Sequence, residues 1–361
     1  MLSALTWRLR RHSLSPRRDA GAVDIAERMI ATRAWPDRVG ELSTTARQTE
    51  PEAGGVADAL VSGELIAAYA FRGGAYIFTP ATADLILTVR QITRVWESPR
   101  FQRQGAFAME SWEPFRRELR QLLSDGPKTR EEIAAHLAGV PRLRGLETGA
   151  LGSGSDCLYK PLHWWGDICF GPAREGSATF RLRTDEATDP HADVDAVGRE
   201  LVRRYLRSYA PVSEENLRYW LNAGLSVPKK RVTTWLDHLD AEIATVRIDG
   251  QDRRVLASDV DDLTGSAPDD SVRLLPCFDA WILGPGTADP LTVPPAQRVK
   301  LSSGADFLIS GGVVSGVWRK RGNRLTVEVF PDRPDVPREA IEAEVRRLER
   351  VLGEDLDAGI R

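Results

Sequence analysis

Two stretches of the chain, residues 118–137 and 203–221, share one pattern of helix-breaking, capping and apolar residues. In the first, a Gly-Pro pair at 126–127 separates two apolar-periodic segments, and Thr129 precedes the second segment with Glu132 three residues later. This spacing predicts a capping box, in which the hydroxyl and the carboxylate each bind an amide at the helix start. Helix, tight turn and capped helix is the helix-turn-helix layout, whose second helix often enters the DNA major groove. The alternative is that two short helices simply pack together.

The second stretch repeats the first in register. An internal repeat at this level of detail indicates one supersecondary unit that is used more than once along the chain. The aligned pairs are Leu122 with Leu206, Pro127 with Pro211, Thr129 with Ser213, Glu131 with Glu215, Ile133 with Leu217, and Leu137 with Leu221.

The composition is that of an ordinary globular chain. It has 361 residues, 42% of them hydrophobic and 28% charged, and this length allows two to four small domains. No segment approaches the roughly 18 unbroken apolar residues of a membrane helix, and no signal-peptide core follows the N-terminal arginines. We therefore expect a cytoplasmic protein with no membrane partner. We also expect it to be a monomer.

Neither the cysteines nor the histidines are spaced for metal binding. The cysteines at 157, 169 and 277 form no CxxC pair, and the five histidines form no HExxH motif. We expect no metal and no other cofactor. The glycine-rich residues 149–155 lack the GKT or GKS ending of a phosphate-binding P-loop, so we interpret them as a loop.

The net charge of −3 does not indicate nucleic-acid binding, but positive charge is concentrated in two segments. Residues 1–38 hold eight arginines against four acids, and residues 90–130 hold nine lysines or arginines against five acids. A positive face on a near-neutral protein can bind a phosphate backbone. The alternative is that these arginines lie on solvated helix faces.

Three β-rich segments follow helical segments, and each is interpreted as a two-stranded hairpin, the wing of a winged helix. They are residues 66–79, split by Arg72-Gly73-Gly74; residues 156–172 with 178–183; and residues 243–258, with Asp249-Gly250 at the turn.

The fold class expected from these patterns is α+β. Winged helix-turn-helix units in tandem are predicted at residues 1–105, 106–190 and 191–262, and a β-barrel-like domain with a terminal helix is predicted at residues 263–361. The last domain is inferred from short strand-like segments, including residues 274–284, that recur from residue 273. The terminal helix is amphipathic, with Ile341, Val345, Leu348 and Leu352 on one stripe.

Together these features resemble a known family, the AlkZ/YcaQ-like winged-helix DNA glycosylases of bacteria. The resemblance covers nearly the whole chain, and the order and spacing of its segments make it specific. The segments are LTWRLRR at 5–11, AFRGGAYIFTP at 70–80, GPKTREEIA at 126–134, YKPLHWWGDICFGP at 159–172, RRYLRSYAPVSEENLRYWL at 203–221, LLPCFDAWILG at 274–284 and VVSGVWRKRG at 313–322.

The resemblance implies a C-shaped arrangement of three winged helices around a channel for double-stranded DNA, and a C-terminal β-barrel. It also implies excision of bulky or crosslinking N7-alkylated purines by a short motif, Gln-x-Gln or Gln-x-Asp. N7-alkylation makes the purine a cationic leaving group. A polar side chain then needs only to position a water and to stabilise the oxocarbenium-like sugar.

The chain departs from this motif. In the aligned stretch, residues 29–38, the two motif positions are Arg33 and Trp35. The Arg33 guanidinium stays protonated and accepts no hydrogen bond, and Trp35 offers one donor and no acceptor. Arginine pairs with phosphate and tryptophan stacks on exposed bases, so both side chains suit DNA binding. The alternative is that Trp35 is a core aromatic and Arg33 a surface residue.

Three functions are consistent with this sequence. The first is a protein that binds DNA or DNA lesions without the usual chemistry. The second is an active DNA glycosylase, in base-excision repair or in self-resistance to a genotoxin, with a divergent centre that uses Asp37, Glu41, Arg33 or Trp35. The third is a protein-interaction scaffold, because winged helices also bind proteins.

The expected partner is double-stranded DNA, including damaged duplex, and several basic residues are predicted to contact its phosphates. They lie at the turn of the first hairpin, at the start of the capped helix and on the return strand of the third hairpin. With Arg33 and Trp35, the predicted DNA-binding residues are Arg72, Lys128, Arg130, Arg253 and Arg254.

Overall fold

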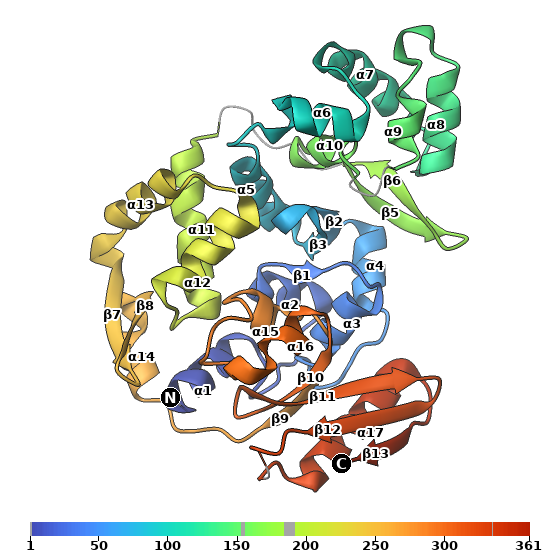
Figure 1. Cartoon of the computed structure of the whole chain (residues 1–361). Helices are drawn as coiled ribbons and strands as arrows, with labels where there is room; N and C mark the ends of the chain where they lie inside the picture. Colours follow the sequence, from blue (N-terminus) through green and yellow to red (C-terminus); the bar gives the residue numbers. More distant parts are fainter. Residues whose placement is uncertain (1, 153–155, 184–191, 334) are drawn as a thin grey trace.

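The computed structural model describes residues 2–152, 156–183, 192–333 and 335–361. These residues form an α+β molecule in which helices alternate with small sheets, as the sequence predicts (Figure 1). In Figure 1 the N-terminal group of elements, in blue, lies at the centre. The second group, in teal and green, lies above it, the third group, in yellow, to its left, and the C-terminal sheet, in red, below.

The N-terminal group is built around a three-stranded sheet. The predicted hairpin is present, with β2 and β3 antiparallel on either side of the turn at residues 72–74. A further strand that the sequence did not predict, β1, pairs with β3 and gives the order β1-β3-β2. The elements are α1 (Leu2–Arg11), α2 (Ala22–Met29), β1 (Thr32–Arg33), α3 (Arg38–Thr45), α4 (Gly55–Ser62), β2 (Ile66–Tyr69), β3 (Ala75–Phe78) and α5 (Pro80–Arg90).

The second group contains the predicted capping box. Thr129 Oγ1 accepts a hydrogen bond from the Glu132 amide at 3.3 Å, and the Glu132 carboxylate accepts one from the Thr129 amide at 2.7 Å. The hairpin starts later than predicted, because Lys160–Trp164 form a helix with Pro161 in its first turn. The elements are α6 (Pro99–Gly105), α7 (Trp112–Leu123), β4 (Lys128–Thr129), α8 (Arg130–Ala138), α9 (Glu147–Ala150), α10 (Lys160–Trp164), β5 (Ile168–Arg174) and β6 (Ser177–Leu182).

The third group contains a second capping box at the position that the sequence repeat predicts. Ser213 Oγ accepts from the Asn216 amide at 3.1 Å and Asn216 Oδ1 accepts from the Ser213 amide at 2.9 Å, which makes a second capping box. In both groups a residue just before the box pairs with the return strand of the hairpin. The elements are α11 (Val194–Tyr209), α12 (Glu214–Arg218), α13 (Lys229–His238), β7 (Ile243–Ile248), β8 (Gln251–Leu256) and α14 (Val260–Thr264).

The C-terminal elements form a curled five-stranded half-barrel, in the order β13-β12-β11-β10-β9. Of the strand predicted over residues 274–284, only residues 274 and 275 belong to a strand, and the prediction is wrong from residue 276 onward. Ala280–Leu283 are helical because the Asp279 carboxylate accepts from the Trp281 amide at 2.7 Å and so caps the turn. The elements are β9 (Val272–Leu275), α15 (Ala280–Leu283), α16 (Arg298–Ser302), β10 (Asp306–Ser310), β11 (Val313–Arg321), β12 (Arg324–Val329), α17 (Arg338–Leu352) and β13 (Asp357–Ile360).

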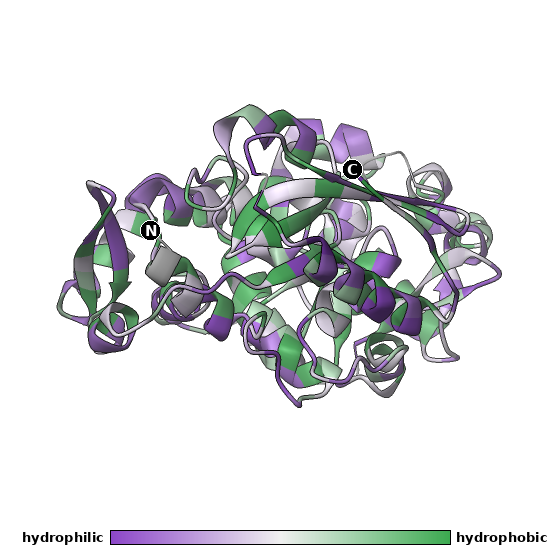
Figure 2. Ribbon diagram, turned by 90° about the horizontal axis from the view of Figure 1, so that it is seen from below, coloured by the Kyte–Doolittle hydropathy of each residue, from purple (hydrophilic) through white to green (hydrophobic). Residues whose placement is uncertain are grey.

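Helices α1 and α17 contribute apolar side chains to the hydrophobic cores. On α1, Ala4 and Trp7 join the large core that runs through the first three groups, whereas Leu5 and Leu9 join a core with the C-terminal elements. The predicted apolar stripe of α17 packs against the C-terminal sheet. Figure 2 shows hydrophobic segments gathered inside the molecule. Within the described ranges, no helix combines the length and the apolar character needed to cross a bilayer.

Candidate nucleic-acid interface

The two motif positions lie beside the turn of the first hairpin. Arg33 ends β1 and stands opposite Tyr76 of β3. The Ala34 amide continues this pairing and donates to the Ala75 carbonyl at 3.1 Å. The chain then turns through Trp35 into α3. The strand that the sequence missed is therefore the element that fixes the direction of the Arg33 side chain.

The Arg33 guanidinium is held between two aromatic rings. Its central carbon lies 5.1 Å from the ring centroid of Tyr76 and 5.6 Å from that of Phe278. Its Nε is buried without a hydrogen-bond partner, and no carboxylate of the described residues pairs with it. A Cβ at Gly74 would collide with Arg33 Nη1, so the glycine makes room for this side chain. Arg33 therefore lies against aromatic rings and forms no ion pair with a carboxylate of the described residues.

Trp35 projects into solvent, with 63% of its surface exposed. The alternative interpretation of Trp35 as a core aromatic is therefore wrong. A large exposed aromatic side chain next to a cation is a suitable platform for stacking on a nucleic-acid base.

The two acids proposed as substitutes for the motif differ in environment. Asp37 is exposed at the start of α3 and its side chain makes no capping hydrogen bond there. Glu41 is half-buried, and its two oxygens accept from the Gly54 amide at 2.7 Å and the Val56 amide at 3.3 Å. Burial raises the pKa of Glu41, although these amides lower it. Glu41 thus holds the start of α4.

Three of the predicted phosphate contacts remain accessible in part. Arg72 is exposed at the hairpin turn, with its guanidinium 4.1 Å from the ring centroid of Tyr219. Lys128 is half-buried in β4. Arg130 is also half-buried and forms an ion pair of 2.7 Å with Asp156, which neutralises its charge.

The prediction that Arg253 contacts DNA is wrong, because its side chain is buried and cannot reach DNA. It forms an ion pair of 3.0 Å with Asp289 and donates to Asn216 Oδ1 at 3.2 Å. Arg254, the next residue in β8, is 40% exposed and lies 3.6 Å from Glu214. Successive side chains of a strand point to opposite faces, so only one of the two adjacent arginines faces solvent.

Lys160 belongs to this region and was missed in the sequence. It starts α10 in the second group, and its Nζ lies 3.0 Å from the position that a Cβ at Gly73 would occupy. Its Nζ also lies 5.3 Å from the ring centroid of Tyr69. The one available signal was a single cation inside an otherwise apolar segment, YKPLHWW.

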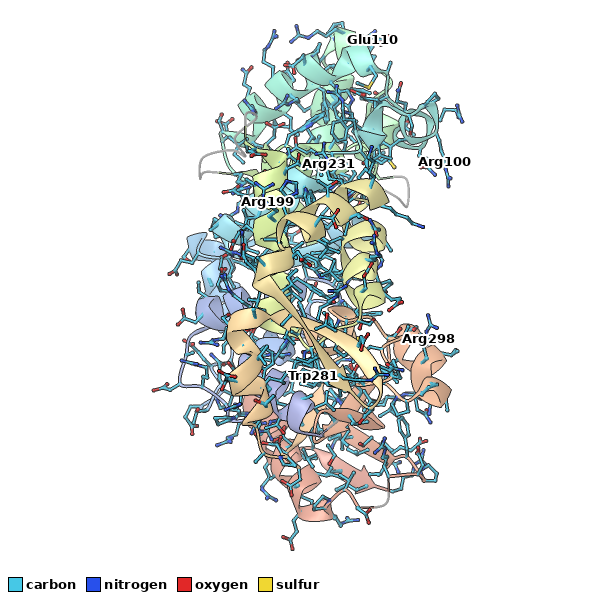
Figure 3. All side chains as sticks on the ribbon, turned by 90° about the vertical axis from the view of Figure 1, so that its left-hand side faces the viewer. Arg100, Glu110, Arg199, Arg231, Trp281 and Arg298 are labelled. Carbon is cyan, nitrogen blue, oxygen red and sulfur yellow. The ribbon has the colours of Figure 1, made fainter. Side chains whose placement is uncertain are left out.

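Several of the arginines concentrated in residues 1–38 form ion pairs within the protein and do not make up a surface for DNA. Arg17 pairs with Glu344 at 2.6 Å and Arg38 with Asp306 at 2.7 Å, and Arg8 lies buried 3.7 Å from Asp289. These arginines bind acids of the C-terminal elements and hold the fold together. In Figure 3 the labelled arginines, Arg100, Arg199, Arg231 and Arg298, lie on different elements from the top of the molecule to its lower part, so surface charge alone does not locate a site.

A repeated unit of capped helix and hairpin occurs in nucleic-acid-binding proteins, and an exposed tryptophan near an arginine suits contact with a base and a phosphate. Comparison with known proteins identifies the family. A model of the AlkZ-like DNA glycosylases matches residues 20–351, and the chain belongs to this family.

A curated protein and a solved structure extend this match to nearly the full chain. An interstrand DNA cross-link repair glycosylase of Streptomyces sahachiroi is 28% identical over 354 residues, which are 96% of this chain and 95% of that protein. The solved structure of Streptomyces sahachiroi DNA glycosylase AlkZ has a TM-score of 0.89 and 28% identity, and the match covers 100% of this chain and 99% of that one. The resemblance seen in the sequence is confirmed.

Proposed function

We propose that this chain is a member of the family that binds duplex DNA, including damaged duplex, without glutamine-dependent base excision. The observation that carries the proposal is the cation at the first motif position. Arg33 is held between two rings, and no carboxylate of the described residues neutralises it. A fixed positive charge disfavours a cationic N7-alkylpurine and opposes the positive charge that develops on the sugar.

The proposal includes three winged helices around a channel for DNA. Its support comes from the second and third groups, where the chain just before the capped helix pairs with the return strand of the hairpin. In the second group strand β4 pairs Lys128 with Phe180, and in the third an isolated bridge joins Val212 to Arg254. The predicted boundary between the second and third units, at 190 and 191, lies outside the described residues. The C-shaped arrangement, the domain limits, the cytoplasmic location and the monomeric state stay predictions.

The test has two measurements on the full-length protein. The first is a gel-shift series with duplex DNA at increasing salt, in which we expect retention that weakens as salt rises. The second is incubation of duplex carrying N7-methylguanine, followed by alkaline cleavage of abasic sites. We expect no cleavage above the heat-released blank. Absence of DNA retention would favour the protein-interaction scaffold instead.

A gain-of-function variant tests the role assigned to the motif positions. The double substitution Arg33→Gln with Trp35→Gln restores the residue types of the family motif and removes the cation. We expect cleavage of the N7-methylguanine duplex to rise above the blank and above the wild type.

Cleavage by the wild type would contradict the proposal and support an active glycosylase with a divergent centre. The variants Asp37→Asn and Glu41→Gln then identify its acid. Because Glu41 holds the start of α4, thermal unfolding is measured beside activity for that variant.

A further inference from the structure

The first three groups share one order of elements. In each, a short strand or bridge is followed by helices and then by a hairpin, and it pairs with the return strand of that hairpin. The helix directly before the hairpin holds the place of the recognition helix in a winged helix. That helix is α4 in the first group, α10 in the second and α13 in the third. The three can therefore be compared as equivalent elements.

Helices α4 and α10 are unsuited to enter a DNA groove. Helix α4 contains no lysine or arginine, and the second group lies against it, since Arg181 donates to the Leu60 carbonyl at 2.9 Å. Helix α10 has five residues, of which residues 161–164 are buried. Helix α13 has ten residues, begins with two lysines and an arginine, and has an exposed side. Of the three, α13 is thus the helix with the length and charge that a groove requires.

The inner side of α13 is held firmly against α11. Val232 and Trp235 are buried, and Trp235 Nε1 donates to the Asp195 carboxylate at 2.7 Å. A Cβ at Gly198 of α11 would collide with the Trp235 ring, so the glycine allows the two helices to pack closely. A binding surface on a rigid helix keeps its geometry better than one on a loop. The third group therefore presents the outer side of α13 in a fixed position.

The outer side of α13 is polar throughout. Residues three and four positions apart share one face of a helix, and the exposed residues of α13 follow this spacing. No carboxylate of the described residues forms an ion pair with either of the two lysines. The one acid among the exposed residues of α13 lies toward the end of the helix. The exposed residues are Lys229, Lys230, Thr233, Thr234, Asp237 and His238.

This chemistry suits a duplex better than a protein partner. Lysines bind phosphates, whereas a threonine can bond to a base edge and contact the thymine methyl group with its own methyl. The hydroxyls of Thr233 and Thr234 donate to the carbonyls one turn back at 3.2 and 3.1 Å, which restricts the rotation of both side chains. Protein interfaces are depleted in lysine and enriched in aromatic residues, and the outer side of α13 has none of the latter.

We propose that α13 is a DNA-recognition helix, with Lys229 and Lys230 on phosphates and Thr233 and Thr234 at base edges of a major groove. A major groove is about 12 Å wide and admits an α-helix. Helix α13 lies at the left of Figure 1 and so faces the viewer in Figure 3, where nothing covers it. The inference rests on the DNA binding proposed above, and it adds a contact in the third group to the motif positions of the first.

The first experiment measures binding of a labelled duplex of roughly two helical turns by fluorescence anisotropy at several salt concentrations. Lys229→Gln with Lys230→Gln should lower the slope of log K against log salt by about 1.8, the value for two lost phosphate contacts. Lys229→Arg with Lys230→Arg keeps the charge and should retain most of the slope. The control, Arg346→Gln with Arg350→Gln, removes the same charge from the exposed side of α17 and should leave the slope unchanged.

The second experiment locates the duplex. All three cysteines are buried, so a cysteine introduced on the surface can be labelled selectively. An iron chelate that cleaves nearby DNA through hydroxyl radicals is attached to Thr233→Cys and, as the control, to Arg346→Cys. We expect the label at position 233 to cleave bound duplex and the label at position 346 to leave it intact.

The outcomes separate this inference from the proposed function. If the wild type binds duplex, but the Lys229→Gln, Lys230→Gln variant keeps the wild-type slope and the label at position 233 does not cleave, the recognition helix is wrong and DNA binding stands. If the wild type retains no duplex at any salt concentration, the proposed function itself fails, and this contact fails with it.

Discussion

The imidazole of His163 is fully buried among aromatic rings of the second group. Its centroid lies 5.0 Å from that of Tyr69, 4.8 Å from Phe170 and 5.7 Å from Phe180. Neither ring nitrogen has a hydrogen-bond partner among the described residues. Burial lowers the pKa of His163 to about 3. The folded protein therefore uses His163 as a neutral, nearly apolar ring.

This residue predicts a loss of stability in acid. In the unfolded chain the pKa of a histidine is about 6.5. Between that pH and about 3, the unfolded state binds a proton that the folded state does not. Stability therefore falls as the pH decreases, by about 1.4 kcal/mol for each pH unit. His163→Phe should lower the pH of acid unfolding, measured by tryptophan fluorescence. The exposed His238→Gln is the control and should leave that pH unchanged.

At the scale of secondary-structure elements, the two capping boxes allow a matched comparison. Thr129 caps α8, and Ser213 caps α12 at the equivalent position of the repeat. Replacing either by alanine should destabilise its own helix by about 1 kcal/mol, because an amide at the helix start loses its acceptor. Hydrogen exchange should accelerate by about fivefold at the first turn of α8 in Thr129→Ala, and at that of α12 in Ser213→Ala. Faster exchange in both helices from one substitution would contradict this local role.

The elements also show what the sequence could and could not predict. Local signals sufficed for the Thr129 box and for the Asp249-Gly250 hairpin, because a few neighbouring residues determine each of them. Strand β1 has two residues and exists only through its pairing with β3, so no periodicity within it could indicate it. The same limit applies to side chains. Lys160 and the hairpin turn that it approaches lie far apart in the sequence, and only the fold brings them together.

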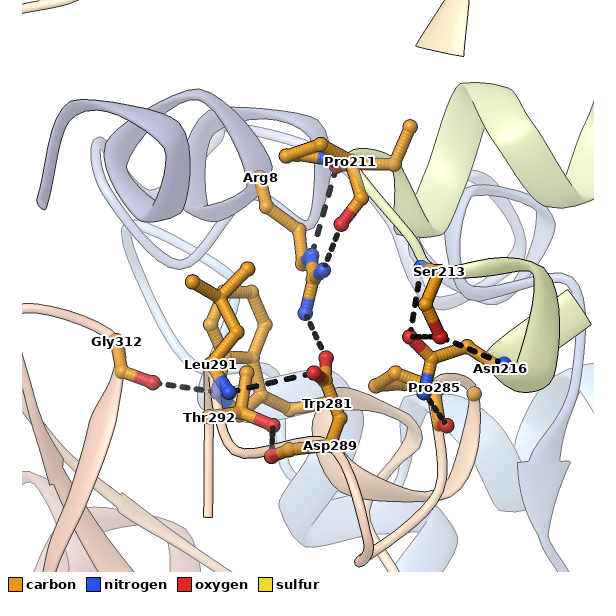
Figure 4. Close-up of polar contacts among 12 residues, drawn as sticks. Arg8, Pro211, Ser213, Asn216, Trp281, Pro285, Asp289, Leu291, Thr292 and Gly312 are labelled. Atoms are coloured by element: carbon orange, nitrogen blue, oxygen red, sulfur yellow. Dashed lines mark hydrogen bonds and ion pairs between the residues drawn. The ribbon is translucent and has the colours of Figure 1, made fainter. Parts of the chain in front are cut away.

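At the scale of the whole molecule, one buried ion-pair network joins the N-terminal helix, the third group and the C-terminal elements (Figure 4). Arg8 of α1 donates to the Pro211 carbonyl at 2.6 Å and lies 3.7 Å from the Asp289 carboxylate. Arg253 of β8 binds the same carboxylate at 3.0 Å. The capping residue Asn216 donates to the Pro285 carbonyl at 2.7 Å. The network thus holds together parts of the chain that are distant in sequence.

Asp289 is the centre of this network, and its removal should affect the whole molecule. The variant Asp289→Ala leaves two buried guanidinium groups without their shared carboxylate, which should cost about 3–5 kcal/mol. The control is Glu342→Ala, which breaks an exposed ion pair with Arg338 and should cost less than about 1 kcal/mol. Thermal unfolding measures both effects. Hydrogen exchange should accelerate together in α1, β8 and the segment around Asp289, because each loses the same anchor. Acceleration confined to the loop at Asp289 would show that α1 and β8 are held by their apolar contacts alone.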